Sequence, residues 1–286
     1  MPKPPINLDT YLKYIPSHSI PLSQESGVPA EHYRRSANDA WNLLVYVERN
    51  LSEVSVYRAS YERHIRRLST MVLLGLVESF ERFLKEIAAE CINHIAGYVV
   101  DGRFDVFTAK GSAVAMQFAE RNLGKALCEA LTWCDCDETN KRIRRILADP
   151  FDAGSFYVFP LANQDPIVLR DRYELMCLIW QLRHTIAHNA AVVTGSDALK
   201  LRLLIQRAVD SPRLLWPTKG DVWYVKLFLD ETAGLINREV SQRLAVLLST
   251  VHNKDNTLFA PNAKAQELAN LFRLPCTVAG QTCNPA

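Results

Sequence analysis

The sequence predicts an all-α fold, and three observations support that prediction. Apolar residues recur at intervals of three and four over most of the chain, which is the period of an amphipathic helix. The alternation of apolar and polar residues that is typical of a half-buried strand is nearly absent. Glycine-rich phosphate loops and the GxSxG and HExxH motifs are also absent. We therefore expect a helical bundle whose function depends on side chains carried by its helices.

The chain begins with a proline-rich arm, which we group with the first helix as residues 1–52. Six prolines lie among residues 1–29, and prolines at that density interrupt helices and remove ladder hydrogen bonds. Two interpretations stay open for this arm: an extended segment that docks on the body or on a partner subunit, and a mobile tail. Residues 30–50 follow as the first predicted helix.

Residues 53–210 are expected to form the helical core. A basic helix over residues 53–68 carries Arg63, Arg66 and Arg67 with interleaved tyrosines, a pattern that suits phosphates and stacked bases but also an ordinary solvated face. Residues 69–96 give the strongest apolar stripe of the chain, and Glu78 lies off that stripe.

Two further helices are predicted over residues 112–133 and 140–148, with a break at 134–139. The second helix presents a basic cluster that is a candidate contact for an RNA backbone, although a solvated face is the simpler reading; its members are Lys141, Arg142, Arg144 and Arg145. An aromatic loop over residues 149–166 then leads into the next helix, and it either covers a substrate cleft or fills the core.

The helix predicted over residues 172–190 holds the densest cluster of reactive side chains. Leu175, Ile179, Leu182 and Ile186 form one apolar stripe, which should face the core. A second, semi-aromatic side carries two histidines one turn apart, and it requires another element or another copy of the chain to cover it; this side comprises Tyr173, Cys177, Trp180, His184 and His188.

Arg183 and His188 are five residues apart, or roughly 140° around a regular helix, so one helix does not bring them to one face. Two copies related by a two-fold axis place two arginines and two histidines in one cleft. After this helix we expect a glycine-terminated end near 194–195 and a helix capped by Ser196 or Asp197.

Residues 211–286 are interpreted as a C-terminal helical extension. A proline-containing linker precedes a long helix over residues 222–251, and a short helix follows over residues 263–272. Residues 273–286 contain two prolines and a glycine, and we expect them to be frayed.

Composition limits the class of protein further. The net charge is +2 and the apolar content is 48%, so no global basic field is present and any RNA contact must be local. Seven cysteines do not indicate a disulfide framework, and the Cys134–Cys136 pair lacks a partner pair at zinc-ligand spacing, so we expect no metal and no cofactor. No signal peptide or membrane span is evident, which favours the cytoplasm.

The stretch from Arg183 to Asn189 resembles the Arg-polar-x-x-x-His motif of HEPN domains, the higher eukaryotes and prokaryotes nucleotide-binding helical family. The stretch from Met71 to Ile87 resembles the HEPN helix that carries an acidic residue and packs against the motif helix. The resemblance covers roughly residues 55–210.

The resemblance implies a dimeric, metal-independent endoribonuclease that acts as a toxin or as an effector of defence against phage, with an antitoxin or regulatory protein as a further partner. By this analogy the RNA 2′-hydroxyl attacks the adjacent phosphate and leaves a 2′,3′-cyclic phosphate. His188 suits the proton transfer and Arg183 suits the developing charge. His184 or Asn189 would orient the reacting groups, and Glu78 would hold Arg183 or His188.

Two alternatives remain at this point. Some HEPN domains are not nucleases and bind only a nucleotide or a protein partner. A helical interaction protein in which the motif is a coincidence is the other.

Overall fold

The computed structural model describes residues 28–52, 58–99, 103–104, 107, 122–129, 131–148, 158–159, 168–205, 208–254 and 259–286. The described part is all-α, as predicted, because it contains eight helices and only two short two-stranded sheets. The N-terminal arm and most of the aromatic loop over 149–166 lie outside the described residues.

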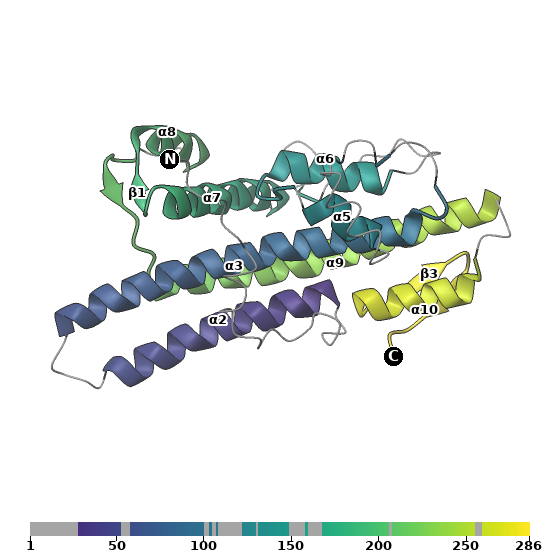
Figure 1. The fold of residues 1–286 in the computed structure, drawn as a ribbon, viewed down its shortest axis with the longest axis horizontal. Helices are drawn as coiled ribbons and strands as arrows, with labels where there is room; N and C mark the ends of the chain where they lie inside the picture. Colours follow the sequence, from purple (N-terminus) through teal and green to yellow (C-terminus); the bar gives the residue numbers. More distant parts are fainter. Residues whose placement is uncertain are drawn as a thin grey trace, which may run out of the picture.

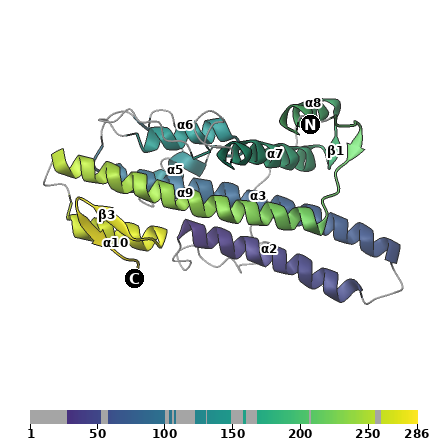
Figure 2. The ribbon, with the colours of Figure 1, turned by 180° about the vertical axis from the view of Figure 1, so that it is seen from behind.

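Two long helices, α3 (Arg58–Ile95) and α9 (Lys219–Lys254), run side by side and parallel along the molecule. Helix α2 (Pro29–Ser52) packs antiparallel on one side of them (Figure 1). Helices α5 (Leu123–Glu129), α6 (Cys136–Ile146) and α7 (Val168–His188) cover the opposite side (Figure 2). One hydrophobic core joins these elements, and it contains residues from α2, α3, α7, α9 and the C-terminal elements.

Helix α3 is continuous over 38 residues, so the predicted division between residues 68 and 69 is wrong. Ser69 is buried in the helix, and the Thr70 hydroxyl bonds back to the carbonyl oxygen of Arg66 at 2.9 Å within the same helix. Because no proline interrupts the run, the polar pair does not end the helix.

The boundaries of α5 and α6 also differ from the prediction. Residues 131–135 are not helical, whereas α6 begins at Cys136, four residues earlier than expected. The Asp135 side chain accepts the backbone N–H of Glu138 at 2.8 Å and so provides the N-cap. Gly124 lets α5 approach α3 closely, since an added Cβ would lie 2.0 Å from the carbonyl oxygen of Ala89.

Helix α7 ends at His188, earlier than the expected glycine. Ala190 and Ala191 take the left-handed backbone, with φ of 49° and 65°. Strand β1 (Val192–Val193) follows and pairs antiparallel with β2 (Arg213–Leu214), and helix α8 (Gly195–Ile205) lies between them in the chain. Alanine carries no sequence signal for a left-handed residue, so the turn was not predictable from composition.

The C-terminal residues are ordered, and the prediction that 273–286 fray is wrong. Helix α10 (Pro261–Phe272) is followed by a hairpin of β3 (Cys276–Val278) and β4 (Gln281–Cys283). Val278 is fully buried and Asn237 of α9 donates to the Phe272 carbonyl oxygen at 2.8 Å. Buried apolar contact and a buried hydrogen bond therefore hold this end against α9.

Within the described ranges, every helix is too short or too polar to cross a bilayer.

Candidate functional site

Helix α7 positions most of the candidate residues, and three neighbours surround it. Met176, Ile179 and Trp180 are buried in the main core, and the Trp180 ring lies 6.0 Å from that of Phe80 on α3. The predicted stripe is therefore rotated, because Leu175 is 39% exposed.

The other sides of α7 pack against α8 and α6. Leu178 and Leu182 pack against the small second cluster that includes α8 residues. Tyr173, on the semi-aromatic side, donates to Asp137 of α6 at 2.8 Å. Another element of the same chain thus covers the first half of that side, which answers one of the two possibilities left open by the sequence.

Arg183 and Glu78 face each other across α7 and α3. An Nη atom of Arg183 lies 4.0 Å from a carboxylate oxygen of Glu78, and the Glu78 side chain is 60% exposed. The buried Nε atom of Arg183 has no hydrogen-bond partner among the described residues. A long ion pair at the surface contributes little to stability, so the guanidinium is held loosely.

Glu81 lies one turn further along α3 and is engaged more tightly than Glu78. It accepts the Trp133 backbone N–H and the Cys134 thiol, each at 3.0 Å. Burial alone would raise the pKa of Glu81, but these two bonds, together with Lys85 and Arg183, lower it below its usual value. Glu81 is therefore an anionic anchor beside Arg183, and no pattern in the sequence indicated this role.

His184 and His188 lie together at the exposed end of α7. Their ring centroids are 4.8 Å apart, as expected for residues one turn apart on a helix, and both side chains are exposed. They do not lie on the Arg183 side of the helix, since about 100–140° of rotation separates them from it.

Asn189 belongs to a different arrangement from its neighbour His188. Its side-chain amide donates to Asp197 Oδ2 at 2.7 Å, and the Gln181 amide donates to Oδ1 at 3.0 Å. Asp197 is buried and also bonds to the backbone N–H and the hydroxyl of Thr194. Asn189 is thus bound into the α7–α8 junction. The N-cap of α8 is Thr194, and not Ser196 or Asp197 as the sequence had suggested.

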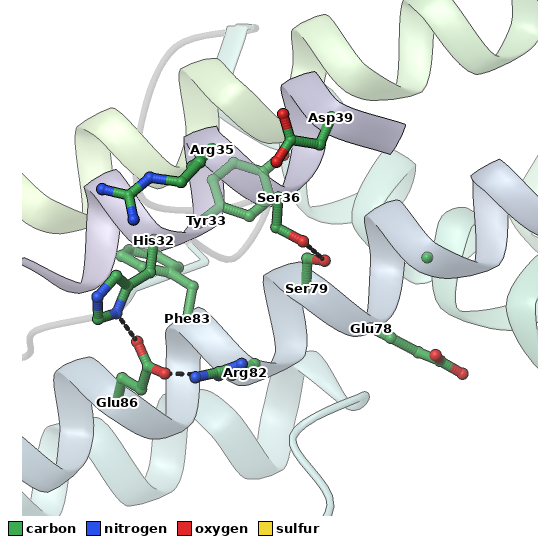
Figure 3. A pocket seen from close by; sticks show the side chains of 11 residues that line it. His32, Tyr33, Arg35, Ser36, Asp39, Glu78, Ser79, Arg82, Phe83 and Glu86 are labelled. Atoms are coloured by element: carbon green, nitrogen blue, oxygen red, sulfur yellow. Dashed lines mark hydrogen bonds and ion pairs between the residues drawn. The ribbon is translucent and has the colours of Figure 1, made fainter. Parts of the chain in front are cut away.

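Cavities lie beside His184 and on both sides of Glu78. A cavity of about 420 Å³ between α6, α7 and α8 is lined by His184, Trp180, Gln181 and three cysteines. A second, of about 480 Å³, lies between α2 and α3 and has Glu78 among its lining residues (Figure 3). In the second cavity Glu86 bridges His32 and Arg82, at 3.1 and 2.7 Å, and Glu78 points away from that bridge.

The five catalytic candidates therefore fall into three groups within one chain: Arg183 with Glu78, His184 with His188, and Asn189 with Asp197. In the described part of the chain, no group of three or more histidine, cysteine and acidic side chains is arranged to hold a metal ion.

The two basic clusters differ in exposure. Arg63, Arg66 and Arg67 are exposed on the first turns of α3, and Arg66 lies 4.0 Å from Glu62. That arrangement is compatible with both interpretations of the cluster, a phosphate contact and a solvated face.

The α6 cluster is only partly available to a ligand. Lys141, Arg144 and Arg145 are exposed, but Arg142 is not, contrary to expectation. The Arg142 side chain is 14% exposed, donates to the Thr132 carbonyl oxygen and lies over the Trp133 ring at 5.4 Å. Arg142 therefore holds the segment before α6, which its position in a charge run did not indicate.

No protein-family model matches the chain, and no curated protein and no solved structure matches it.

Proposed function

We propose that the chain is a HEPN-like, metal-independent endoribonuclease that cleaves RNA at a site completed by two copies. The observation that carries the proposal is the exposed pair of imidazoles at the end of α7, with ring centroids 4.8 Å apart. Between residues 172 and 183 most of that helix is covered by α3, α6 and α8, whereas His184 and His188 are open to a ligand.

The chemistry needs a base, an acid and a cation. A base takes the proton of the RNA 2′-hydroxyl, whose oxygen attacks the adjacent phosphorus, and an acid protonates the departing 5′-oxygen. The products are a 2′,3′-cyclic phosphate and a 5′-hydroxyl end. An imidazole accepts a proton on one ring nitrogen and can donate one from the other, so His188, with His184 beside it, suits both proton transfers. Arg183 suits the phosphorane because its guanidinium stays protonated and binds phosphate oxygens in pairs.

A second copy supplies what one chain does not bring together. Arg183 approaches Glu78 on α3, while His188 lies roughly 140° around α7. An isologous contact near the end of α7 repeats both residues across a two-fold axis. The exposed arginines of α3 and α6 would then contact the RNA backbone.

The proposed setting is a cytoplasmic toxin or defence effector restrained by an antitoxin or regulatory protein. The cytoplasmic assignment is supported by seven cysteines that are all free thiols, as expected in a reducing compartment.

The test is cleavage of RNA by the purified protein in excess EDTA. We expect cyclic-phosphate ends from the wild type and a loss of at least about 100-fold in rate for His188→Ala, the usual scale for removing a general acid or base. His252→Gln is the matched control, because His252 lies near the end of α9 and packs against Phe259. Equal rates in the wild type and His188→Ala would refute the assignment of the site.

A non-catalytic HEPN-like module that binds a nucleotide or a protein is the second candidate. The Arg183–Glu78 ion pair and the Asn189–Asp197 bond favour it, because they engage two motif residues in contacts within the chain. RNA binding without cleavage by the wild type, weakened by Arg66→Ala, would select this candidate over the nuclease.

A further inference from the structure

Three cysteines meet at the cavity beside His184, and their surroundings differ. Cys134, Cys136 and Cys177 all line it. The Cys134 thiol donates to Glu81 at 3.0 Å, and burial together with this bond raises the pKa of Cys134 to about 12. Cys134 is therefore held as a neutral thiol that points to a carboxylate. Among the described residues, no carboxylate accepts a hydrogen bond from Cys136 or Cys177 in this way.

The thiols of Cys136 and Cys177 contact each other across two helices. Cys136 is the first residue of α6 and is buried, whereas Cys177 lies in the middle of α7 and is partly exposed. Their thiol groups are within hydrogen-bonding reach of each other. Tyr173, one turn before Cys177, donates a hydrogen bond of 2.8 Å to Asp137, the residue after Cys136. This hydrogen bond joins α6 and α7 beside the two cysteines.

Access to solvent and the same contact distinguish the two thiols chemically. A peroxide must reach the sulfur that it oxidises, and Cys177 is partly exposed whereas Cys136 is buried. Cys177 is therefore the nucleophile of the pair and Cys136 its partner. The interaction with Cys136 also lowers the pKa of Cys177, which favours the reactive thiolate.

We propose that Cys136 and Cys177 form a reversible disulfide between α6 and α7 when a hydroperoxide reaches the cavity. The Cys177 thiolate attacks one peroxide oxygen, the O–O bond breaks, and hydroxide leaves, so that Cys177 becomes a sulfenic acid. The Cys136 sulfur then attacks the Cys177 sulfur, and its proton leaves with the displaced oxygen as water. Two electrons pass from the sulfurs to the peroxide in total, and a dithiol reverses the change.

The location gives the disulfide a consequence for the candidate site without depending on nuclease activity. His184 and His188 follow Cys177 by seven and eleven residues. Both intervals are close to a whole number of helical turns, so the three residues share one face of α7. Oxidation therefore alters the wall of the cavity that His184 shares, on the same face as the imidazole pair. A bond between α6 and α7 at this point also limits how far the two helices separate.

The chain contains a second cysteine pair that serves as an internal control. Cys276 and Cys283 lie opposite each other on β3 and β4. Their sulfurs bond elsewhere, Cys276 to Ser241 at 3.1 Å and Cys283 to Asn262 at 3.1 Å. If backbone proximity alone decided which disulfide forms, Cys276 and Cys283 would be oxidised first. If contact between the thiols decides, Cys136 and Cys177 would be oxidised first.

The experiment treats the reduced full chain with hydrogen peroxide and maps linked peptides by mass spectrometry without reduction. We expect the Cys136–Cys177 peptide to form about tenfold faster than the Cys276–Cys283 peptide, and to disappear with dithiothreitol. A different pair forming first, or peroxide modifying Cys177 no faster than the other cysteines, would overturn the proposal. This measurement uses the wild type, so it stands even where a cysteine variant fails to fold.

Three variants sharpen the assignment. In Cys136→Ala, Cys177 should accumulate as a sulfenic acid that dimedone traps, because the partner thiol is gone. In Cys177→Ala neither disulfide nor trapped product should form at this site. Cys134→Ala, which removes a thiol from the same cavity, should keep the disulfide. Loss of the disulfide in Cys134→Ala instead would show that Cys134 is the true partner.

Discussion

Two Thr-x-x-Asp sequences start helices on either side of β2, and they differ in what else they bind. At α8 the Thr194 backbone N–H donates to Asp197 at 3.1 Å and the Asp197 N–H returns to the Thr194 hydroxyl at 3.2 Å. At α9 the corresponding bonds of Thr218 and Asp221 are 2.7 and 3.2 Å. Both are capping boxes by the same local geometry.

The difference lies in burial and in the neighbouring helix. Asp197 is 2% exposed and accepts two further bonds from Asn189 and Gln181 of α7. The box at α9 is exposed, and within the described part of the chain its side-chain hydrogen bonds join only Thr218 and Asp221. The same four-residue motif is therefore a local cap at α9 and a joint between two helices at α8. A motif indicates that a helix starts, but its surroundings decide how much it stabilises.

The largest expected effect follows from removing the buried carboxylate. Asp197→Ala should lower the free energy of unfolding by about 3 kcal/mol, because donors on α7 and at the start of α8 lose a charged acceptor. Asp221→Ala should cost only about 0.5–1 kcal/mol, the usual value of an exposed cap. Chemical denaturation of both variants checks the comparison. Equal losses would mean that the bonds to α7 add nothing.

A smaller effect is expected at Asn189. Asn189→Ala removes one bond to Asp197 and should cost about 1 kcal/mol in stability. RNA cleavage, measured well below the unfolding midpoint, should fall less than threefold, roughly the scale of a positional change. His188→Ala should show the reverse pattern, with little loss of stability and a large loss of rate. A large loss of cleavage rate in an Asn189→Ala protein that remains folded would show that Asn189 acts in the cleavage reaction.

The smallest expected effect is the change with pH in the stability that Asp197 contributes. Burial alone would raise the pKa of Asp197, but the bonds from Thr194 and Asn189 and the nearby His184 lower it. A folded-state pKa below the unfolded value of about 3.9 stabilises the fold above that pH, and the stabilisation is lost as pH falls through the folded-state value. The stability gap between the wild type and Asp197→Asn should be constant near neutrality and narrow below about pH 4. A gap that widens in acid would contradict the lowered pKa.

The sequence predicted the helical class and the long helices because apolar periodicity over many residues is hard to mistake. The family resemblance implied that Glu78 would hold Arg183 or His188, and in the fold a carboxylate oxygen of Glu78 lies 4.0 Å from Arg183. The sequence did not predict that Asn189 and Asp197 meet, since the left-handed Ala190 and Ala191 turn the chain back without a glycine to mark the turn.

Other errors have the same origin in tertiary contact. The C-terminal hairpin has a proline on each side and a glycine in its turn, a composition that is typical of a frayed tail. Its order comes from Val278, which is buried against the core. Arg142 resembled its exposed neighbours in sequence, but Trp133 and the Thr132 carbonyl oxygen take up its guanidinium. The contacts of Val278 and Arg142 depend on the packed fold. The spacing of apolar and charged residues along the sequence does not indicate them.

The parallel course of α3 and α9 has a consequence for how the chain reaches its fold. Helices α2 and α3 are neighbours in sequence and pack antiparallel, so their contact closes a short loop. Helix α9 reaches α3 only after α5, α6, α7 and α8 have been traversed, and closing so long a segment costs more chain entropy. We expect the α2–α3 hairpin to be the early scaffold and α9 to dock late. Until α9 docks, its apolar face and that of α3 are open to water and to other chains.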